Sequence, residues 1–409
     1  MSTINKKTVG AVAIIAIVAV AAVAVVVFMP GGTPSEDPIR VGILEPLTGG
    51  TSASGRGALY GFQVAAQQIN EAGGILGRQV VLIAEDTEGN PEKGVSAATK
   101  LITVDNVDVL MGVISSAVVM GVAEVAADYQ VPFISTNPTT SAFTELVSDD
   151  YERYKYLFRT QWNVTQWMFA WFDDFTSLFP DIDSLMFVTE DLTWAREADV
   201  EMEAFCTAAG MDYEGLLFTP GTTDFTPEIA QIETFDPDIV LVDLLLSTSI
   251  SLQKQWWALK PDILFVGASG VLSYPSTIRE LGAEESNYTL TYNHLWNVSL
   301  TEHTVDYFND FYLFSGQEPF GADITSYDGL MLYSQAVEAA ASTNADGVVS
   351  QLETGTFTAG RGTYEFMDNH QAAYIPGVIL QWINTEPTVI WPTSLATGSY
   401  QRPPWITSP

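Results

Sequence analysis

Cysteine and histidine are scarce in this chain of 409 residues. The single cysteine, Cys206, excludes an internal disulfide framework and any metal site built from several cysteines. The three histidines, His294, His303 and His370, are scattered and form no H-E-x-x-H pattern, so a zinc hydrolase is not indicated. The chain therefore lacks much of the side-chain chemistry on which hydrolases and redox proteins depend.

Positive charge is also scarce. The chain has 16 Lys and Arg against 50 Asp and Glu, which gives a formal net charge of −34. Nucleic-acid binding needs basic side chains that displace counterions from phosphates, and docking on anionic lipid needs basic patches. We therefore expect no nucleic-acid partner, and we interpret the acidity as a solvated surface.

Motifs for catalysis and nucleotide binding are absent or incomplete. The glycines of "LTGGTSASGRGALYGF" stand at Gly55, Gly57 and Gly61, one residue out of register for a dinucleotide fingerprint, and no Walker loop occurs. The stretch "GASGV" lacks the second glycine of a nucleophile elbow two places after Ser269. We predict no catalytic residue, metal or cofactor, and no enzymatic activity. A helix N-terminus that small polar ligands can use remains possible at the glycine loop.

The N-terminal region contains a long uncharged run. Residues 9–29 carry no charged side chain and follow Lys6 and Lys7, so they are long enough to span a bilayer and predict a body outside the cytoplasm. We expect residues 1–29 to form a transmembrane signal anchor, with 30–38 as a linker. A cleaved signal peptide is the alternative, although no A-x-A site lies directly before Pro30.

From Ile39 onward, short apolar runs alternate with amphipathic segments, as in parallel strands joined by helices. One such series covers residues 39–136 and a second covers 184–270, so the chain predicts two doubly wound parallel-sheet lobes. A helix is expected within 326–343, an extended crossover near 287–296, and strands at 363–368 and 378–383. Lobe 1 is expected to combine residues 39–160 with 292–357, and lobe 2 to combine 161–291 with 358–395, before a tail at 396–409. Three crossing strands would then form a hinge that permits closure.

Several stretches resemble one protein family. The runs "INEAGGILGRQV" and "GVISSA", with "YDGLMLYSQAVEAAAST" further on, are similar to the leucine/isoleucine/valine-binding proteins, which are ABC transporter substrate-binding proteins of the type I periplasmic-binding fold. The resemblance extends from Ile39 to about Leu395. It implies two α/β lobes that hold a small ligand between them and deliver it to ABC permease and ATPase subunits.

The resemblance also places ligand contacts on the first lobe. The serine pair after the third expected strand becomes Ser115 and Ser116, which would bind a carboxylate. The loop after the fourth strand contributes Asn137 and Thr139. The contact in the first loop falls near Ser54, where relatives often carry an aromatic ring.

The second lobe departs from the amino-acid-binding pattern. Relatives place acids against the ligand ammonium at two positions that are Asn163 and Ser269 in this chain, and Trp194 stands where a tyrosine packs on the ligand. An ammonium buried without a carboxylate is costly, so Asp191 or Asp243 would have to compensate. Trp162, at an expected strand end, is a further candidate contact. Such a site would suit an amino acid, an amide, or an apolar or aromatic carboxylate.

We therefore expect a membrane-tethered extracytoplasmic solute-binding protein of an ABC importer. A ligand-sensing ectodomain of the same fold is the alternative within the binding class. An extracellular α/β enzyme is the alternative from another class, and it would need a nucleophile or metal cluster that the sequence does not display.

Overall fold

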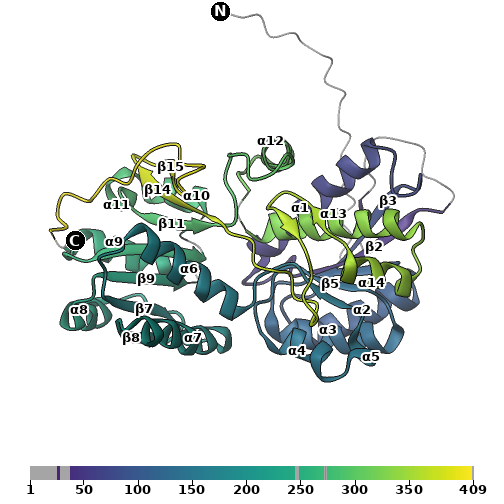
Figure 1. Ribbon diagram of the computed structural model, residues 1–409, viewed down its shortest axis with the longest axis horizontal. Helices are drawn as coiled ribbons and strands as arrows, with labels where there is room; N and C mark the ends of the chain where they lie inside the picture. Colours follow the sequence, from purple (N-terminus) through teal and green to yellow (C-terminus); the bar gives the residue numbers. More distant parts are fainter. Residues whose placement is uncertain are drawn as a thin grey trace, which may run out of the picture.

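The computed structural model describes residues 25–27, 37–244, 248–270, 272, 274–319 and 321–407, without side chains at 25–27 and 268–270 (Figure 1). Of the segment predicted to cross the membrane, only strand β1 (Val25–Val27) is described, and it pairs with a strand of the first sheet. The rest of that segment lies outside the described residues. No helix within the described ranges is long and apolar enough to cross a membrane, so the predicted transmembrane helix is not shown.

The first lobe contains a six-stranded sheet in the order β1-β3-β2-β4-β5-β6, parallel except for β1. The strands after β1 are β2 (Ile39–Glu45), β3 (Val80–Asp86), β4 (Val109–Gly112), β5 (Phe133–Ser135) and β6 (Leu157–Arg159). Their helices are α1 (Ser52–Glu71), α2 (Pro91–Thr103), α3 (Ser116–Tyr129), α4 (Ala142–Asp149) and α5 (Tyr151–Tyr154). Because both faces of the sheet are covered, the strands are apolar nearly throughout.

The second lobe contains a seven-stranded sheet in the order β15-β14-β11-β10-β9-β7-β8. Its strands are β7 (Ser184–Glu190), β8 (Asp212–Phe218), β9 (Ile239–Leu244), β10 (Leu264–Gly270), β11 (Leu290–Asn293), β14 (Val378–Ile383) and β15 (Glu386–Trp391). Strands β7 to β11 are parallel, and β14 and β15 are antiparallel additions. The helices are α6 (Val164–Leu178), α7 (Thr193–Ala209), α8 (Thr226–Phe235), α9 (Thr248–Leu259), α10 (Pro275–Leu281) and α11 (Ala283–Ser286). The prediction of two parallel-sheet α/β lobes is confirmed.

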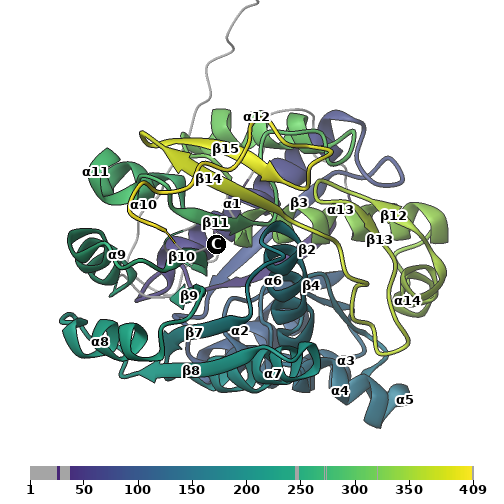
Figure 2. The same ribbon diagram turned by 60° about the vertical axis from the view of Figure 1, so that its left-hand side comes forward.

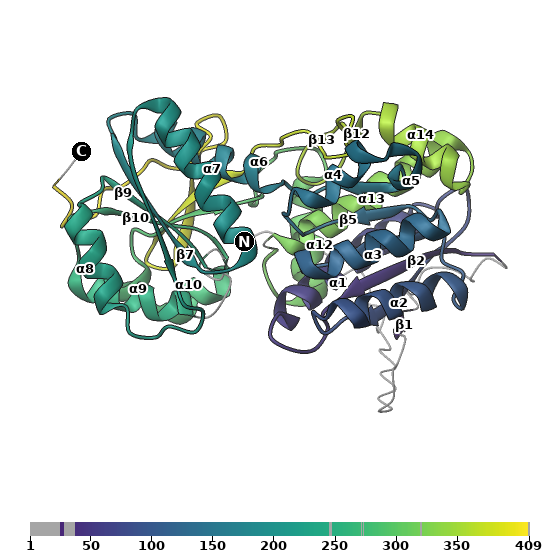
Figure 3. The same cartoon turned by 90° about the horizontal axis from the view of Figure 1, so that it is seen from below.

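The chain returns to the first lobe after β11, as Figures 2 and 3 show. The returning part comprises α12 (Thr304–Ser315), α13 (Ala322–Ala340), α14 (Ala345–Thr354) and the hairpin β12 (Phe357–Thr358) with β13 (Thr363–Tyr364). The connections out of β6 and into β14 run side by side, because the Arg159 backbone N–H donates to the His370 carbonyl at 3.0 Å and the Ala372 N–H donates to the Arg159 carbonyl at 2.9 Å. The predicted division of residues between the lobes stays a prediction.

Two glycines within α1 have a packing role. A Cβ on Gly61 would lie 2.0 Å from the Asp323 carbonyl oxygen of α13, and one on Gly55 would lie 2.2 Å from the Pro46 carbonyl oxygen. These glycines therefore let backbone approach backbone, as P-loop glycines do for phosphate, but here the space is filled by the protein itself. The close approach of Gly61 to Asp323 allows α1 to pack directly against α13.

Candidate functional site

Polar side chains follow the carboxyl ends of neighbouring strands in the first lobe. Ser115 and Ser116 lie at the start of α3, just beyond β4, and both are half-buried. The Ser115 hydroxyl makes no capping bond to its own helix. Open parallel sheets bind ligands at this edge, since the loops at the carboxyl ends of the strands gather there. The structure thus brings the predicted serine pair to the edge where a ligand would be expected.

Asn137 and Thr139, beyond β5, connect this edge to other elements. The Thr325 hydroxyl of α13 donates to Asn137 Oδ1 at 3.0 Å, and Asn137 Nδ2 donates to the Ser326 hydroxyl at 3.4 Å. The Thr139 carbonyl accepts from the backbone N–H of Val164, the first residue of α6, at 3.0 Å. Asn137 is therefore held by lobe 1, whereas Thr139 contacts the segment that enters lobe 2.

Ser54 lies at a contact between the lobes. Its hydroxyl is 2.9 Å from the hydroxyl of Tyr274, which precedes α10 in lobe 2. Nearby, Arg279 of α10 makes a two-point ion pair with Glu318, in the segment between α12 and α13. These residues line a pocket of about 210 Å³ between the two lobes. Since Ser54 follows β2 and Tyr274 follows β10, strand-end loops of both sheets meet here.

The predicted site residues of lobe 2 do not share one edge of the sheet, unlike those of lobe 1. Asn163 caps α6: its Oδ1 accepts from the Gln166 N–H at 2.7 Å, and Gln166 Oε1 accepts from the Asn163 N–H at 3.1 Å. Trp194 lies in the first turn of α7, half-buried against the aromatic core of the lobe. The side chain of Ser269 lies outside the described residues. The capping box with Gln166 is sufficient to explain an asparagine at position 163, whether or not Asn163 also borders a cleft.

Asp243 is buried near the end of β9, and Glu190, at the end of the neighbouring strand β7, is a second buried carboxylate that the sequence reasoning missed. Thr189 of β7 pairs with Asp243 in the sheet, and Glu190 follows it directly. Glu190 is fully buried and accepts from the Thr248 hydroxyl at 2.7 Å. Asp191, the other acid considered, is exposed and pairs with Arg196 at 2.6 Å. In the sequence, Glu190 could have been identified as a candidate because it stands at the end of a predicted strand, just after the apolar run at 185–188 and Thr189.

A cationic group lies among aromatic rings where the chain crosses between the lobes. The Arg361 guanidinium carbon lies 4.6 Å above the centre of the Trp162 ring, and Trp162 also contacts His294, Trp167 and Tyr374 at ring-centre distances of 4.6, 5.4 and 5.7 Å. We call these five residues the Arg361 cluster. Arg361 and Trp162 are each only 2% exposed. The sequence reasoning had singled out Trp162 but not Arg361. The feature that could have drawn attention to Arg361 is its place between two glycines in a chain poor in basic residues.

Burial sets the charge states around this cluster. The pKa of His294 lies well below its usual value because the ring is buried and because the Arg361 charge opposes protonation. Asp328 of α13 accepts bonds from the Gly360 and Arg361 backbone N–H groups and from the Tyr364 hydroxyl. Burial raises its pKa to about 6, although these bonds and the Arg361 charge act in the opposite direction. The cluster therefore holds a neutral imidazole beside a permanent cation.

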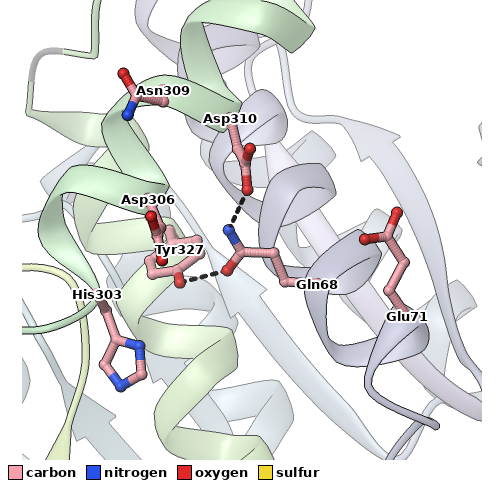
Figure 4. A pocket seen from close by; sticks show the side chains of 7 residues that line it. All are labelled: Gln68, Glu71, His303, Asp306, Asn309, Asp310 and Tyr327. Atoms are coloured by element: carbon pink, nitrogen blue, oxygen red, sulfur yellow. Dashed lines mark hydrogen bonds between the residues drawn. The ribbon is translucent and has the colours of Figure 1, made fainter. Parts of the chain in front are cut away.

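A larger pocket, of about 300 Å³, lies away from these residues between α1, α12 and α13 (Figure 4). Gln68 spans it: its Nε2 donates to Asp310 at 2.7 Å, and its Oε1 accepts from the Tyr327 hydroxyl at 2.6 Å. The rim is acidic, but the side chains in the described ranges form no group suited to hold a metal ion. We assign no ligand to this pocket.

The two sheets, the crossings between them and the strand-end loops that meet at Ser54 and Tyr274 define a class of protein. They describe a two-lobed α/β protein of the type I periplasmic-binding fold.

Comparison with known proteins identifies the family. A model of the periplasmic binding protein family matches residues 38–386, and the chain belongs to that family. It is 23% identical to Leu/Ile/Val-binding protein homolog 7 of Brucella suis, over 91% of this chain and 96% of that protein. A leucine-binding protein from Thermotoga maritima shares the fold with a TM-score of 0.72 and 21% identity, over 87% of this chain and 100% of the other. So does an ABC transporter solute-binding protein from R. palustris in complex with benzoate, with a TM-score of 0.73 and 18% identity, over 90% and 99%. The resemblance predicted from the sequence is confirmed.

Proposed function

We propose that this chain is the extracytoplasmic solute-binding protein of an ABC importer, and that it closes its two lobes around a small organic molecule without changing it chemically. The observation that carries this proposal is the meeting of strand-end loops from both sheets, where Ser54 bonds Tyr274 across the lobes. A ligand held there would contact both lobes and stabilise the closed form. Membership in a family of binding proteins supports the same reading.

The residues proposed to contact the ligand in lobe 1 are Ser54, Ser115, Ser116, Asn137 and Thr139. Those proposed in lobe 2 and at the crossing are Trp162, Asn163, Trp194, Asp243 and Ser269. Support for the lobe 1 set is its common position at the carboxyl edge of the sheet. Support for Asp243 is its burial near the carboxyl end of β9, where it could replace one of the acids that relatives place at Asn163 and Ser269.

Two ligand classes are consistent with this arrangement. The name of the Brucella suis relative points to branched-chain amino acids, and the buried carboxylate of Asp243 could receive an ammonium. The benzoate complex of the R. palustris protein points to aromatic carboxylates, and the rings around Trp162 would suit them. Either ligand is small, carries a carboxylate and has an apolar remainder.

Calorimetric titration of the purified full chain with leucine, valine, benzoate and benzamide tests the proposal. We expect saturable binding of one ligand per chain, with the ligand recovered unchanged. Recovery of a chemically altered ligand would contradict a role limited to binding. Loss of uptake of the same ligand when the chain is deleted from its host would support the import role and its permease and ATPase partners.

We further propose that the uncharged run at residues 9–29 tethers the chain to the membrane with the body outside the cytoplasm; the description of the family as periplasmic binding proteins supports the second part. Strand β1 occupies Val25–Val27 in the structure, so a spanning helix that includes these residues would require β1 to leave the sheet. Fractionation of the host, followed by N-terminal sequencing of the mature protein, distinguishes an uncleaved anchor from a removed signal peptide.

A further inference from the structure

The Arg361 guanidinium makes no hydrogen bond of good geometry within the described part of the chain. Its Nε, Nη1 and Nη2 atoms are all buried. An arginine carries five N–H donors in a planar fork, so three buried nitrogens without acceptors are far from the usual state of this side chain. The stacking on Trp162 compensates part of the charge but satisfies none of the donors.

The position of Arg361 is fixed by the first lobe. The backbone N–H groups of Gly360 and Arg361 donate to the Asp328 carboxylate of α13 at 2.7 and 3.2 Å. That carboxylate also accepts from the Tyr364 hydroxyl at 2.6 Å. Asp328 therefore anchors the loop that carries Arg361, while the guanidinium extends to Trp162 instead of bonding back to Asp328. These bonds fix the backbone at Arg361 and thereby the position from which its guanidinium extends.

Trp162, by contrast, belongs to the second lobe. Its ring is part of the hydrophobic cluster formed by α6, α7 and strands β7 and β9, and it directly precedes the cap of α6. The contact between Trp162 and Arg361 thus joins one lobe to the other. Both groups lie beside the crossings about which the lobes open, so a ligand would reach the guanidinium by displacing the Trp162 ring from it.

We propose that Arg361 receives the carboxylate of the ligand, and that the ligand is an aromatic or apolar monocarboxylate without an ammonium group. This inference rests on the proposed binding function and names its ligand class. The planar fork matches the two oxygens of a carboxylate, and the rings of Trp162, Trp167 and Tyr374 match an apolar remainder. The unpartnered indole N–H groups of Trp162 and Trp167 provide further donors to an anion. An ammonium at this place would face the Arg361 charge and an Asp328 carboxylate that three donors already occupy.

Titration of the purified full chain with benzoate, benzamide and leucine tests this assignment. We expect the wild type to bind benzoate, and Arg361→Gln to weaken that binding by at least about 30-fold, because a buried charge pair is lost. Benzamide has the same ring and no charge, so its weaker binding should change less than about threefold. Arg153→Gln is the matched control, since Arg153 is an exposed arginine of lobe 1 paired with Glu124, and it should leave benzoate binding unchanged.

Arg361→Lys separates loss of the ligand contact from loss of the fold. It keeps the charge but not the fork, and we expect cooperative unfolding like that of the wild type with benzoate binding weakened about tenfold. Benzoate affinity that is the same in the wild type, Arg361→Gln and Arg361→Lys would overturn the assignment. Binding of leucine but not benzoate by the wild type would also overturn it, while leaving the proposed binding function in place. Failure to bind any carboxylate would overturn it as well.

Discussion

At the scale of single residues, Asp86, the last residue of β3, holds the glycine-rich loop in place. Its Oδ1 accepts from the backbone N–H groups of Leu47 and Glu88 at 2.9 and 2.8 Å, and its Oδ2 accepts from the Thr48 hydroxyl at 2.6 Å. Burial alone would raise the pKa of Asp86, but these bonds outweigh burial and hold the pKa below its usual value. The glycine loop is thus tied to a protein carboxylate.

We expect Asp86→Asn to lower the free energy of unfolding by about 1 kcal/mol at pH 7, because bonds to a charged acceptor are replaced by bonds to a neutral one. The folded-state pKa of Asp86 lies below the unfolded value of about 4, so the stabilisation is fully present above that value and is lost as the pH falls through the folded-state pKa. Urea unfolding of both proteins between pH 7 and pH 3 measures this difference.

The matched control for Asp86 is Asp149→Asn, at an exposed acid of α4 in the same lobe. It should change the free energy of unfolding by less than about 0.5 kcal/mol across the same range. A difference between Asp86→Asn and the wild type that grows toward pH 3 would contradict the role assigned to the carboxylate.

The same scale shows why site residues were hard to assign from sequence. Asn163 occupies a position that the resemblance assigned to the ligand, and it also completes a capping box with Gln166. Arg361 drew no attention because its burial depends on α13 and on Trp162, which lie far from it in the chain. Both facts depend on long-range packing, which one-dimensional patterns do not contain.

At the scale of elements, the contact between α1 and α13 depends on a residue without a side chain. Gly61→Ala would place a Cβ 2.0 Å from the Asp323 carbonyl oxygen, so the helices must move apart. We expect the free energy of unfolding to fall by about 1–3 kcal/mol, the usual cost of overpacking. Urea unfolding of Gly61→Ala and the wild type at pH 7 measures this difference in the free energy of unfolding.

Gly57, one turn earlier on α1, is the matched control. No atom lies within 4 Å of a Cβ built there, so Gly57→Ala should raise the free energy of unfolding by up to about 1 kcal/mol, because alanine favours helix more than glycine does. Equal effects of the two substitutions would contradict a role for close packing at Gly61.

The elements were predictable where their periodicity was strong. The apolar runs of β2, β3, β9 and β14 and the long amphipathic α13 are found where the sequence indicates them. Strand β15 and helices α12 and α14 were not expected. Helices α12 and α14 carry polar residues at several positions, which weakens their apolar periodicity. Strand β15 is the second arm of a hairpin and is separated from β14 by only two residues. The expected strand at 363–368 is reduced to the two residues of β13.

At the scale of the whole molecule, the two lobes are joined at one side by polar contacts as well as by the crossing segments. The Ser54–Tyr274 hydrogen bond and the Arg279–Glu318 ion pair both connect lobe 2 to lobe 1. Contacts of this kind exist only when the lobes are close together, so they favour the closed arrangement by a modest amount.

We expect the double variant Tyr274→Phe with Arg279→Gln to weaken ligand binding about five- to thirtyfold, because each of the two lost contacts contributes about 0.5–1 kcal/mol to closure. Small-angle scattering of the full chain should show a larger radius of gyration than for the wild type. Arg153→Gln, which breaks an ion pair within lobe 1, should alter neither quantity. An unchanged radius of gyration and affinity in the double variant would show that these contacts do not govern closure.

The interleaved course of the chain also has a consequence for biosynthesis. Lobe 1 lacks α13 and lobe 2 lacks β14 until the ribosome has passed residues 340 and 383, so neither sheet can complete its packing while the first two thirds of the chain emerge. Each lobe is consequently completed only late in translation, after the segments of the other lobe that interrupt it.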